Sequence, residues 1–514
     1  GEQEPLCTYR IANFKTASAD KDAGAAFLKY KDFKPYVDYF NSMEDENIAQ
    51  AIPNARASQW MEENIPLFEC SQKNFEEMYY YRWWTLRKHI KETPVGYGMT
   101  EFLVNRSYAD KYNLIACAIG HHIYESRWLR NPEYLNQIIH TWYRGNEGGP
   151  MAKMTKFSSW NADAVLGRYM VDGNKEFLLD MVKDLEAEYA RWEKTNRLPN
   201  GLYWQGDVQD GMEESISGGR RKQYARPTIN SYMYGNAKAL SLIGIMTGDE
   251  GMAMKYGLKA DSIKTLVQDK LWNTDHHFFE TMRGDASAEV REAIGYIPWY
   301  FNLPDASSKY TVAWKEVMDE KGFSAPYGLT TAERRHPEFR THGVGKCEWD
   351  GAIWPFASAQ TLTAMANFMN NYPQTVLTDS VYFHHMERYV ESQHHRGRPY
   401  IGEYLDEVTG YWLKGDQERS RYYNHSTFND LMITGLIGLR PRMDNTVEVN
   451  PLIPEGKWDY FCLDNVLYHG RNLTILWDKD GSRYQRGKGL HIYVDGKEVG
   501  HSDTLTRVLC ENVL

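Results

Sequence analysis

Three acidic side chains lie within five positions of the segment QDGMEESISGG, residues 209–219: Asp210, Glu213 and Glu214. Ionised carboxylates this close repel one another, and partial burial would disfavour the charged form further, so at least one of the three is expected to have a raised pKa. A carboxyl that keeps its proton near neutral pH can act as a general acid. Because a glutamate-rich loop is usually only a solvated surface, the neighbouring residues must decide between the two interpretations.

Those neighbours are aromatic and amide side chains. The segment GLYWQGD, which carries Trp204, precedes the acids, and RPTINSYMYGNA, which carries Asn230, follows them. Aromatic faces stack on apolar faces of ligands, including the C–H faces of sugar rings. General-acid cleavage of a glycosidic bond needs a second carboxylate, and RPYIGEYLDEVTGYW supplies Glu403 beside Tyr404. Glu407, within the turn-like DEVTG, is better suited to a capping or ion-pair role.

Composition narrows the class of partner. Of the 514 residues, 42% are hydrophobic and 25% charged, and 59 Lys and Arg against 69 Asp and Glu give a net charge of −10. This balance gives no electrostatic reason to expect nucleic acid or an anionic membrane as partner. A mean hydropathy of −0.63 without a long apolar run excludes a membrane span. The 14% aromatic content, with 16 Trp and 36 Tyr, favours an oligosaccharide or small glycoside as substrate.

The sequence predicts neither a metal nor a cofactor. The six cysteines are scattered without a C-x-x-C pair, and no phosphate-binding glycine loop, serine elbow or H-E-x-x-H helix occurs. His121 and His122 are adjacent on a predicted helix, so they point about 100° apart and cannot chelate one ion. The chain starts at Gly1, which we interpret as a removed signal peptide and export to the periplasm or exterior, with a cytoplasmic location as the alternative. Oligomeric state is not predicted.

Helices must position these residues. From about 74 to 440, apolar residues recur at spacings of three and four, and polar turns such as VDGNKE, MTGDEG and MNNYPQ separate the blocks. The predicted helices are 74–91, 109–127, 131–143, 160–170, 174–194, 227–246, 249–271, 293–301, 307–319, 351–371, 374–394 and 421–437. Paired as hairpins, they fit an (α/α)6 toroid. An α-solenoid would show a similar pattern, but no unit of fixed length repeats. Long loops at one end of a toroid would build a pocket.

The two ends of the chain differ from this pattern. After GLRPR, short alternating stretches (TVEVNP, NLTILWD, LHIYVDG and DTLTRVL) are separated by turn dipeptides, which predicts a small antiparallel β-sandwich. The N-terminal residues are polar and mixed. We therefore expect a mainly α protein with three parts: a strap packed on the toroid at 1–64, the catalytic toroid at 65–440 and the β domain at 441–514.

Four motifs carry a family resemblance: GMEESISGG with RPTINSYMYGNAKALSLIG, CEWDGAIWPFASAQTL, IGEYLDEVTGYW, and YYNHSTFNDLMITGLIGLRP. Together they resemble the inverting (α/α)6 glycoside hydrolases that include trehalases, N-glycan processing α-glucosidases and the mannosylglycerate hydrolase-like group. The resemblance implies that Glu213 is the general acid, that WDGAIWP lines the sugar pocket and that Glu403 is the general base. The families place Asp where Glu213 stands, so Asp210 remains the second choice for the acid and Glu214 is also open.

The resemblance also implies the residues that would touch the sugar. We expect substrate contacts from Trp204, Trp349, Asp350, Trp354, Arg82, Trp84, Glu101, Asn230, Tyr404 and His425, although a helix-start role is equally expected for His425. The expected activity is inverting, exo-acting hydrolysis of a terminal, α-linked gluco- or manno-configured sugar, with the two carboxyls roughly 6.5–9.5 Å apart. A glycoside phosphorylase and a non-catalytic carbohydrate-binding protein are the alternatives.

Overall fold

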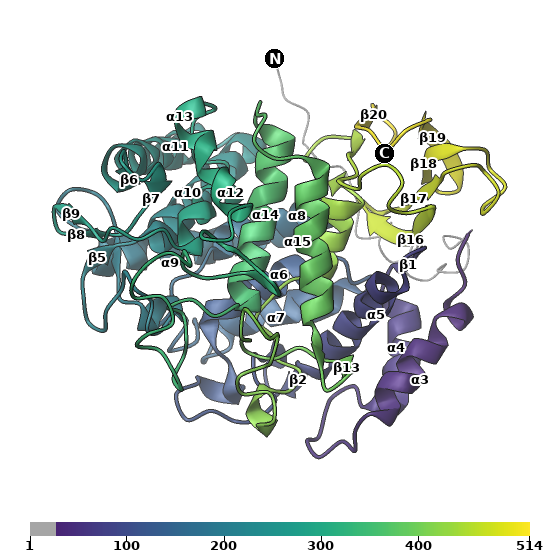
Figure 1. Cartoon of the computed structure of the whole chain (residues 1–514), viewed down its shortest axis with the longest axis horizontal. Helices are drawn as coiled ribbons and strands as arrows, with labels where there is room; N and C mark the ends of the chain where they lie inside the picture. Colours follow the sequence, from purple (N-terminus) through teal and green to yellow (C-terminus); the bar gives the residue numbers. More distant parts are fainter. Residues whose placement is uncertain (1–26) are drawn as a thin grey trace.

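Helices dominate the computed structural model, which describes residues 27–514 (Figure 1). The first part of the expected strap, residues 1–26 with Cys7, lies outside the described residues. The helices from α5 onward are α5 (Lys73–Lys88), α6 (Ile119–Ser126), α7 (Pro132–Arg144), α8 (Asn161–Asp172), α9 (Lys175–Asn196), α10 (Pro227–Thr247), α11 (Glu250–Leu266), α12 (Ile297–Tyr300), α13 (Ser308–Thr311), α14 (Pro355–Asn371), α15 (Asp379–Ser392) and α16 (Asn429–Leu431). A mainly α chain is therefore confirmed.

Two of the polar turns use the same capping device. Gly173 after α8 and Gly248 after α10 both adopt left-handed backbone, with φ of 67° and 74°, which ends each helix without a Cβ penalty. The next residues, Asn174 and Asp249, then accept a hydrogen bond from a backbone N–H in the first turn of α9 and α11. Each Gly–Asn or Gly–Asp pair thus ends one helix and starts the next.

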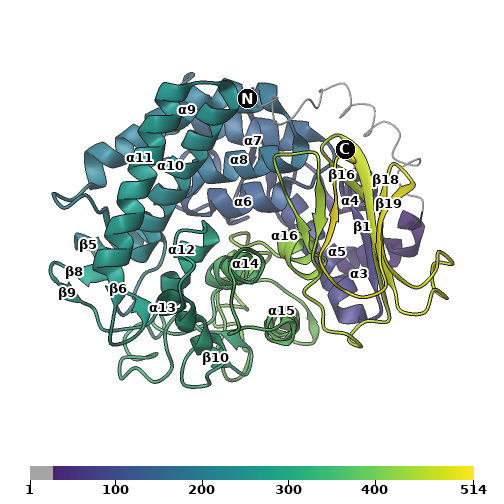
Figure 2. The ribbon, with the colours of Figure 1, turned by 90° about the horizontal axis from the view of Figure 1, so that it is seen from above.

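Consecutive pairs of helices pack around a closed cycle. Helix α6 packs on α8, α8 on α10, α10 on α12, α12 on α14, α14 on α16, and α16 on α6. Seen from above, α9 and α11 lie outside α8 and α10 (Figure 2). Helix α10 buries nearly all its residues whereas α11 buries only one side, as expected for an inner and an outer helix. This arrangement is compatible with the expected toroid.

Several predicted helices are shorter than the apolar pattern indicates. The segment 307–319 is the four-residue α13 followed by a 3-10 helix, Val312–Val317, and the segment 421–437 is α16 followed by a π-helix, Met432–Leu436. Apolar spacing of three and four does not distinguish these tighter or wider turns from an α-helix. Within the described residues, no helix has the length and apolar character required to cross a bilayer.

Two antiparallel sheets lie at the C-terminal end. The larger has the order β1-β16-β17-β18-β19, and the smaller has the order β14-β15-β20. Their bounds are β1 (Leu67–Cys70), β14 (Leu439–Arg440), β15 (Val447–Val449), β16 (Tyr460–Tyr468), β17 (Arg471–Asp478), β18 (Gly489–Val494), β19 (Lys497–Ser502) and β20 (Val508–Cys510). The sequence pattern did not predict β1, β14, β16 or β19.

Strand β1 ties the N-terminal region to the C-terminal sheet. It pairs with β16 in the register Leu67↔Asp464 to Cys70↔Phe461. The Asp464 carboxylate also accepts the backbone N–H groups of Phe27 and Leu28 at 3.0 Å. Between these contacts, α3 (Lys34–Ser42) and α4 (Asn54–Asn64) pack against α5. The two ends of the chain therefore fold against each other.

Candidate functional site

The candidate residues lie in loops that precede the helices of the packing cycle. Glu101 lies in the loop before α6, Glu213 before α10, Trp349 and Trp354 before α14, and Glu403 before α16. In Figure 1, α14 starts at its lower end, beside the antiparallel α15. The charges of Glu101 and Glu403 both act on Glu213, so these loops lie near one another although they are far apart in sequence.

Glu213 has the electrostatic environment of a general acid. It is half-buried in the turn that follows the 3-10 helix Val208–Asp210. Burial, together with the negative charges of Glu403, Asp207 and Glu101, raises the pKa of its carboxyl to about 7. A carboxyl with this pKa is partly protonated at neutral pH and can donate its proton.

Glu403 is a second buried carboxyl, close enough to act electrostatically on Glu213, and it has cationic neighbours. It is 5% exposed, and within residues 27–514 its Oε2 has no hydrogen-bond partner. Burial raises the pKa of this carboxyl, whereas Lys414, Arg419 and Arg106 lower it. Arg419 Nη2 lies 3.9 Å from Glu403 Oε2. These cations stabilise the ionised form that a general base requires.

Glu101 contributes a third buried carboxyl. It accepts hydrogen bonds from the hydroxyl of Tyr423 and from Cys117 Sγ at 3.0 Å. Burial raises the pKa of Glu101 to about 7 despite these bonds, and the charge of Glu403 adds to the shift. The Glu101 backbone carbonyl also accepts the N–H of Asn424 at 3.0 Å, so the loops before α6 and α16 are joined at this point.

Stacked aromatic rings form one wall of the site. The rings of Trp349 and Trp354 stack with centroids 4.6 Å apart, and those of Trp354 and Tyr404 stack at 4.4 Å. The His425 ring lies 6.1 Å from Trp354 and 4.2 Å from Tyr423. Such faces suit the apolar side of a sugar ring.

Unsatisfied polar atoms border this wall. Trp349 Nε1 and both ring nitrogens of His425 are buried without a hydrogen-bond partner in the described part of the chain. Burial lowers the pKa of His425 well below its ordinary value, so its imidazole is neutral and can donate one hydrogen bond and accept another. Buried polar atoms are normally paired, and these three have no partner among residues 27–514.

Asp210, the second choice for the acid, has its side-chain bonding occupied inside the protein. Asp210 is 2% exposed, its Oδ2 accepts from Arg226 Nε at 2.7 Å and from Thr228 at 2.6 Å, and its Oδ1 accepts from Ser158. Both oxygens of this carboxylate are therefore occupied by partners inside the protein. Glu214 lies 3.7 Å from His342 and 3.8 Å from Lys346. Glu213 is the member of the trio without an ion pair in the described structure.

Three predicted substrate contacts have their side-chain bonding occupied inside the protein. Arg82 donates to Ser426, and Trp84 Nε1 donates to Asn41 at 2.8 Å. The side-chain amide of Asn230 accepts the backbone N–H of Tyr203 and donates to the carbonyl of the same residue. All three are buried. Because these groups already have partners, their contribution is to hold the loops and helices that carry the site.

Asp350 and Trp204 have intermediate positions. Asp350 Oδ2 accepts the backbone N–H groups of His342 and Gly343 at 3.0 and 2.8 Å, while its buried Oδ1 has no partner within residues 27–514. It therefore orders the loop before α14 and keeps one oxygen available to a ligand. Trp204 lies half-buried in β4 (Trp204–Gln205), opposite Ala225. Its contact with substrate stays a prediction.

A group of metal-ligating side chains lies elsewhere, on the segment around β6 (Trp272–Asn273) and β7 (Phe278–Phe279). Within the described residues, His276, Glu280 and Glu289 bring ligand atoms within 4.8 Å of one another. His276 Nδ1 lies 2.7 Å from Glu280 and Nε2 lies 3.1 Å from Glu289. Both ring nitrogens of His276 therefore have carboxylate partners.

The site combines two interacting carboxyls with an aromatic wall. Glu213 has a pKa raised to about 7, and Glu403 lies beside cations. Glycoside hydrolases use this arrangement. Residues 111–426 match the family model described as the mannosylglycerate hydrolase MGH1-like glycoside hydrolase domain, and the chain belongs to this family. Residues 439–501 match the C-terminal domain of glycosyl hydrolase family 65, which lies in the predicted β domain.

Solved structures agree with this assignment at the level of the fold. A structure named "Sialidase" is 83% identical over 96% of this chain with a TM-score of 0.96, and this chain spans 46% of that protein's length. A family 63 mannosylglycerate hydrolase from Thermus thermophilus in complex with glucose is 11% identical, with 69% of this chain and 99% of that chain covered and a TM-score of 0.50. A family 78 rhamnosidase of Bacillus sp. is 10% identical, with 80% of this chain and 40% of that chain covered and a TM-score of 0.56.

Proposed function

We propose that this chain is an inverting, exo-acting glycoside hydrolase on an (α/α)6 toroid. Glu213 protonates the leaving oxygen, and Glu403 deprotonates a water molecule that attacks the anomeric carbon from the opposite face. The observation that supports this proposal most directly is the different charged surroundings of two interacting buried carboxyls: acidic groups add to the raised pKa of Glu213, whereas cations oppose the rise that burial causes in the pKa of Glu403. The toroid occupies residues 65–440, with the strap at 1–64 and the β-sandwich at 441–514.

The division of roles follows from the charges around each carboxyl. The charged side chains that act on Glu213 are acidic, so its proton is retained to about pH 7. Glu403 has three cationic neighbours that oppose the effect of burial, so it ionises more readily. Two titratable groups whose environments differ in this way indicate which is the acid and which is the base.

The aromatic wall supports binding of a terminal sugar ring. Trp349, Trp354 and Tyr404 offer stacked faces, and His425 and Asp350 offer polar atoms that have no partner within the described structure. The glycone we propose is α-linked and gluco- or manno-configured. Because the 83% identical structure is named a sialidase, a sialoside joins the substrates that need testing.

The test is a panel of aryl glycosides and natural disaccharides, incubated with the wild type, Glu213→Gln and Glu403→Gln. Proton NMR of the first product formed gives its anomeric configuration. We expect inverted configuration from the wild type and loss of turnover in both variants. Retained configuration would rule out attack by water activated by Glu403.

A further inference from the structure

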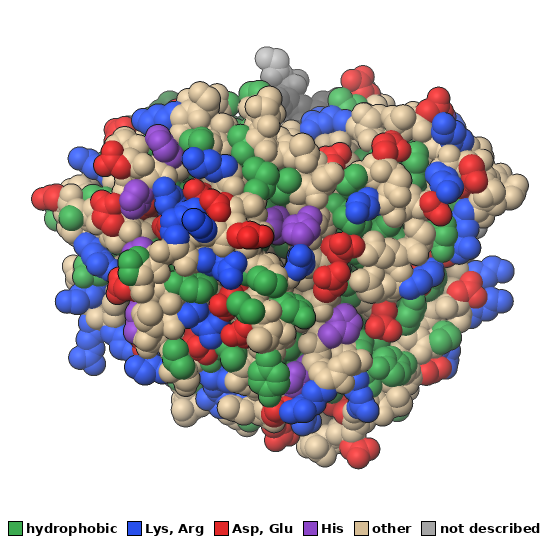
Figure 3. All heavy atoms as spheres, viewed as in Figure 1, with side chains coloured by type: hydrophobic (Ala, Val, Ile, Leu, Met, Phe, Trp, Pro, Cys, Tyr) green, Lys and Arg blue, Asp and Glu red, His purple; other side chains and the backbone are tan. Residues whose placement is uncertain are grey.

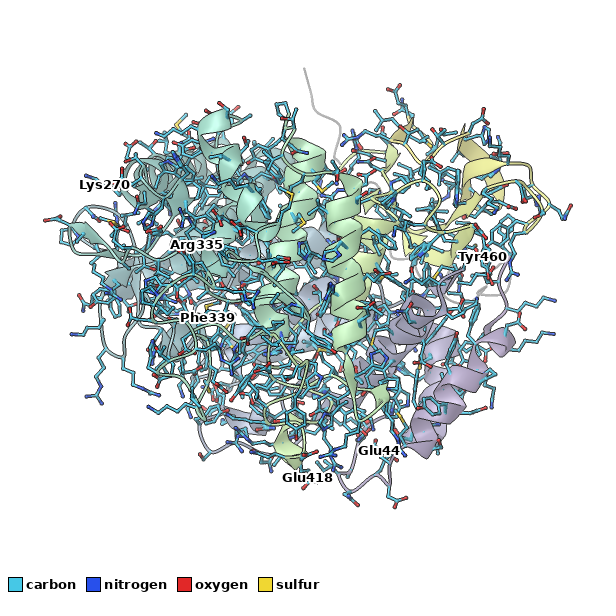
Figure 4. All side chains as sticks on the ribbon, in the orientation of Figure 1. Glu44, Lys270, Arg335, Phe339, Glu418 and Tyr460 are labelled. Carbon is cyan, nitrogen blue, oxygen red and sulfur yellow. The ribbon has the colours of Figure 1, made fainter. Side chains whose placement is uncertain are left out.

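A second cavity lies toward the opposite end of the packed helices. Its volume is about 630 Å³, within the range of roughly 300–1,000 Å³ that is typical of small-molecule sites. On α14 the cavity is lined by residues 363–371, whereas Trp354 directly precedes this helix. Asn367 follows Trp354 by 13 positions, which corresponds to about 20 Å along the helix axis. Glu418, in the segment before α16 that also carries Glu403, lies at the lower edge of the molecule (Figure 4). We call the second cavity the far cavity.

Buried aromatic rings separate the far cavity from the candidate site. Tyr300 lines the far cavity, and its hydroxyl accepts a hydrogen bond from Trp160 Nε1 at 3.0 Å. The centroid of the Trp160 ring lies 6.0 Å from that of Phe356. The Phe356 ring in turn lies 5.8 Å from His425 and 6.1 Å from Trp349, which belong to the candidate site. The far cavity is therefore a distinct place in the fold.

The walls of the far cavity are helices. Each helix of the packing cycle contributes at least one side chain: Tyr124 from α6, Asp163 from α8, Tyr234 from α10, Tyr300 from α12, Asn367 from α14 and Asp430 from α16. Strands β14 and β15 add Arg440 and Glu448. Side chains on packed helices are held more precisely than side chains on loops, so these groups are preorganised for a ligand.

Two cations of the far cavity are paired with two of its carboxylates. Arg127 Nη2 lies 2.8 Å from Asp430 Oδ1, and Arg442 Nη1 lies 2.7 Å from Glu448 Oε1. Each pair combines one positive and one negative charge. These four residues therefore give the wall strong dipoles but no net charge of their own.

Three further polar groups keep bonding capacity for a ligand. Lys238 and Arg440 form no ion pair among residues 27–514. Arg440 donates to Asn367 Oδ1 at 2.7 Å and to one backbone carbonyl, which uses two of its five N–H groups. Asp163 Oδ2 accepts from the Tyr124 hydroxyl at 2.6 Å, while Oδ1 has no hydrogen-bond partner in the described part of the chain. Donors and an acceptor are thus available in one cavity.

We propose that the far cavity is a second, non-catalytic site that binds a neutral sugar. A sugar hydroxyl both donates and accepts, so it can bond Arg440 and Asp163 at the same time. A free anion would be repelled by Asp163 and Glu448, and a free cation would be repelled by Arg440 and Lys238. The Tyr234 ring adds an aromatic face suited to the C–H face of a sugar. This inference does not depend on the proposed hydrolase activity.

The surface and the protonation of Asp163 agree with a neutral ligand. On the face of the molecule seen in Figure 3, basic and acidic side chains are intermingled, so no large patch of one sign there attracts an ion. Burial raises the pKa of Asp163 to about 7, so near neutral pH this carboxyl can accept a hydrogen bond or donate one. Recognition must therefore come from short-range hydrogen bonds inside the cavity.

The first measurement compares sugars that differ only in charge. Calorimetric titration of Glu213→Gln at slightly acidic pH, where an amino sugar carries its proton, uses two series of probes. One is D-glucose, D-glucuronate and D-glucosamine, and the other is D-galactose, D-galacturonate and D-galactosamine. We expect the neutral sugar of at least one series to bind about tenfold more tightly than both charged partners, since either charge meets a like charge in the cavity.

The second measurement locates the bound sugar. Hydrogen–deuterium exchange with mass spectrometry is expected to show that the neutral sugar protects residues 234–242 of α10 and 363–371 of α14. Leu242→Trp, which adds a large side chain to the wall of the cavity, is expected to abolish this protection. Leu179→Trp, at an exposed position of α9, is the matched control and is expected to keep it.

A polar variant tests the hydrogen bonding without filling the cavity. Asp163→Asn keeps an acceptor for the Tyr124 hydroxyl but loses the charge and the titratable proton, and it is expected to bind the neutral sugar about tenfold more weakly. Asp261→Asn, at an exposed position of α11, is the matched control. Circular dichroism verifies that each variant is folded.

Three outcomes would overturn the proposal. The first is that no neutral sugar of either series binds. The second is protection confined to the loops before α6, α10, α14 and α16 and unchanged in Leu242→Trp, because the sugar would then occupy the candidate site alone. The third is a charged sugar that binds as tightly as its neutral partner. A protein that binds a neutral sugar in the far cavity but hydrolyses no glycoside would keep this inference and refute the proposed function.

Discussion

The negative charge of Glu403 raises the pKa of the Glu213 carboxyl, although 190 positions separate the two residues in the chain. The loops before α10 and α16 therefore bring the two carboxyls near one another, which is a condition for an acid and a base to act on one bond. Two carboxyls that interact in this way titrate as a coupled pair.

The coupling predicts a change in one residue when the other is replaced. Glu403→Gln removes a negative charge, so the pKa of Glu213 is expected to fall from about 7 toward its ordinary value. Carbon-13 NMR of labelled glutamate side chains would follow the titration. An unchanged Glu213 titration would show that the two carboxyls do not share a cavity. Glu407→Gln is the matched control, because Glu407 pairs with Arg340.

Replacement of the acid is expected to depend on the leaving group. Glu213→Gln cannot protonate the departing oxygen, so kcat for a natural glycoside falls by about 10²- to 10⁴-fold. A 2,4-dinitrophenyl glycoside leaves without protonation and is expected to lose much less. Glu214→Gln, changed at the next position, keeps normal turnover of both substrates. Equal losses on both substrates in Glu213→Gln would assign the acid role elsewhere.

The pH dependence of turnover follows from the two pKa shifts. Glu213 acts protonated, so kcat/KM declines as pH rises through about 7. Glu403 acts ionised, and burial raises its pKa, so the acidic limb lies above the ordinary glutamate value. We expect a narrow bell-shaped profile, measured with an aryl glycoside across the range from acidic to alkaline pH. Full activity sustained well into the alkaline range would contradict the assignment of Glu213.

Sequence periodicity was enough for the longer helices because their apolar residues recur at helical spacing over many turns. The pairs Gly173–Asn174 and Gly248–Asp249 also marked helix ends correctly, since left-handed glycine and side-chain capping are local effects. Strand β1 could not be predicted in the same way. Its partner β16 lies almost 400 positions later, so its pairing is decided by the tertiary fold.

Residue type indicated which groups can bond but not which partners occupy them. Arg82 and Asn230 have the donors that a sugar site uses, yet internal partners take them. Asp210 and Glu213 are both acids of one short segment, and the position of Arg226 distinguishes them. Arg106 and Lys414 belong to no motif, so nothing in the local pattern indicated that they lie beside Glu403.

Asp210 is expected to matter for stability. Asp210→Ala leaves Arg226 buried without its counter-ion, which costs about 3–5 kcal/mol in the free energy of unfolding. Chemical denaturation followed by tryptophan fluorescence would measure this loss. Asp210→Asn, which keeps hydrogen-bonding capacity, is expected to cost less and to retain the normal dependence on the leaving group. A stable Asp210→Asn enzyme that needs an activated leaving group would instead make Asp210 the acid.

Glu213 is expected to destabilise the folded protein at alkaline pH. Its folded pKa of about 7 exceeds that of an ordinary glutamate, so the folded state binds the proton more tightly than the unfolded chain. The resulting contribution to stability is complete below the ordinary pKa and is lost as pH rises through about 7. Glu213→Gln cannot ionise, so its Tm is expected to match the wild type at about pH 4 and to exceed it by about 1–3 °C at about pH 8.

Differential scanning calorimetry at both pH values measures this difference, with Glu214→Gln as the neighbouring control. Glu214 lies near His342 and Lys346, so its replacement is not expected to raise the Tm at the higher pH. A Glu213→Gln variant with a lower Tm than the wild type at alkaline pH would mean that the surroundings stabilise the ionised Glu213 carboxylate. That result would remove the basis for its role as the proton donor, because a general acid must hold its proton at the pH where the enzyme works.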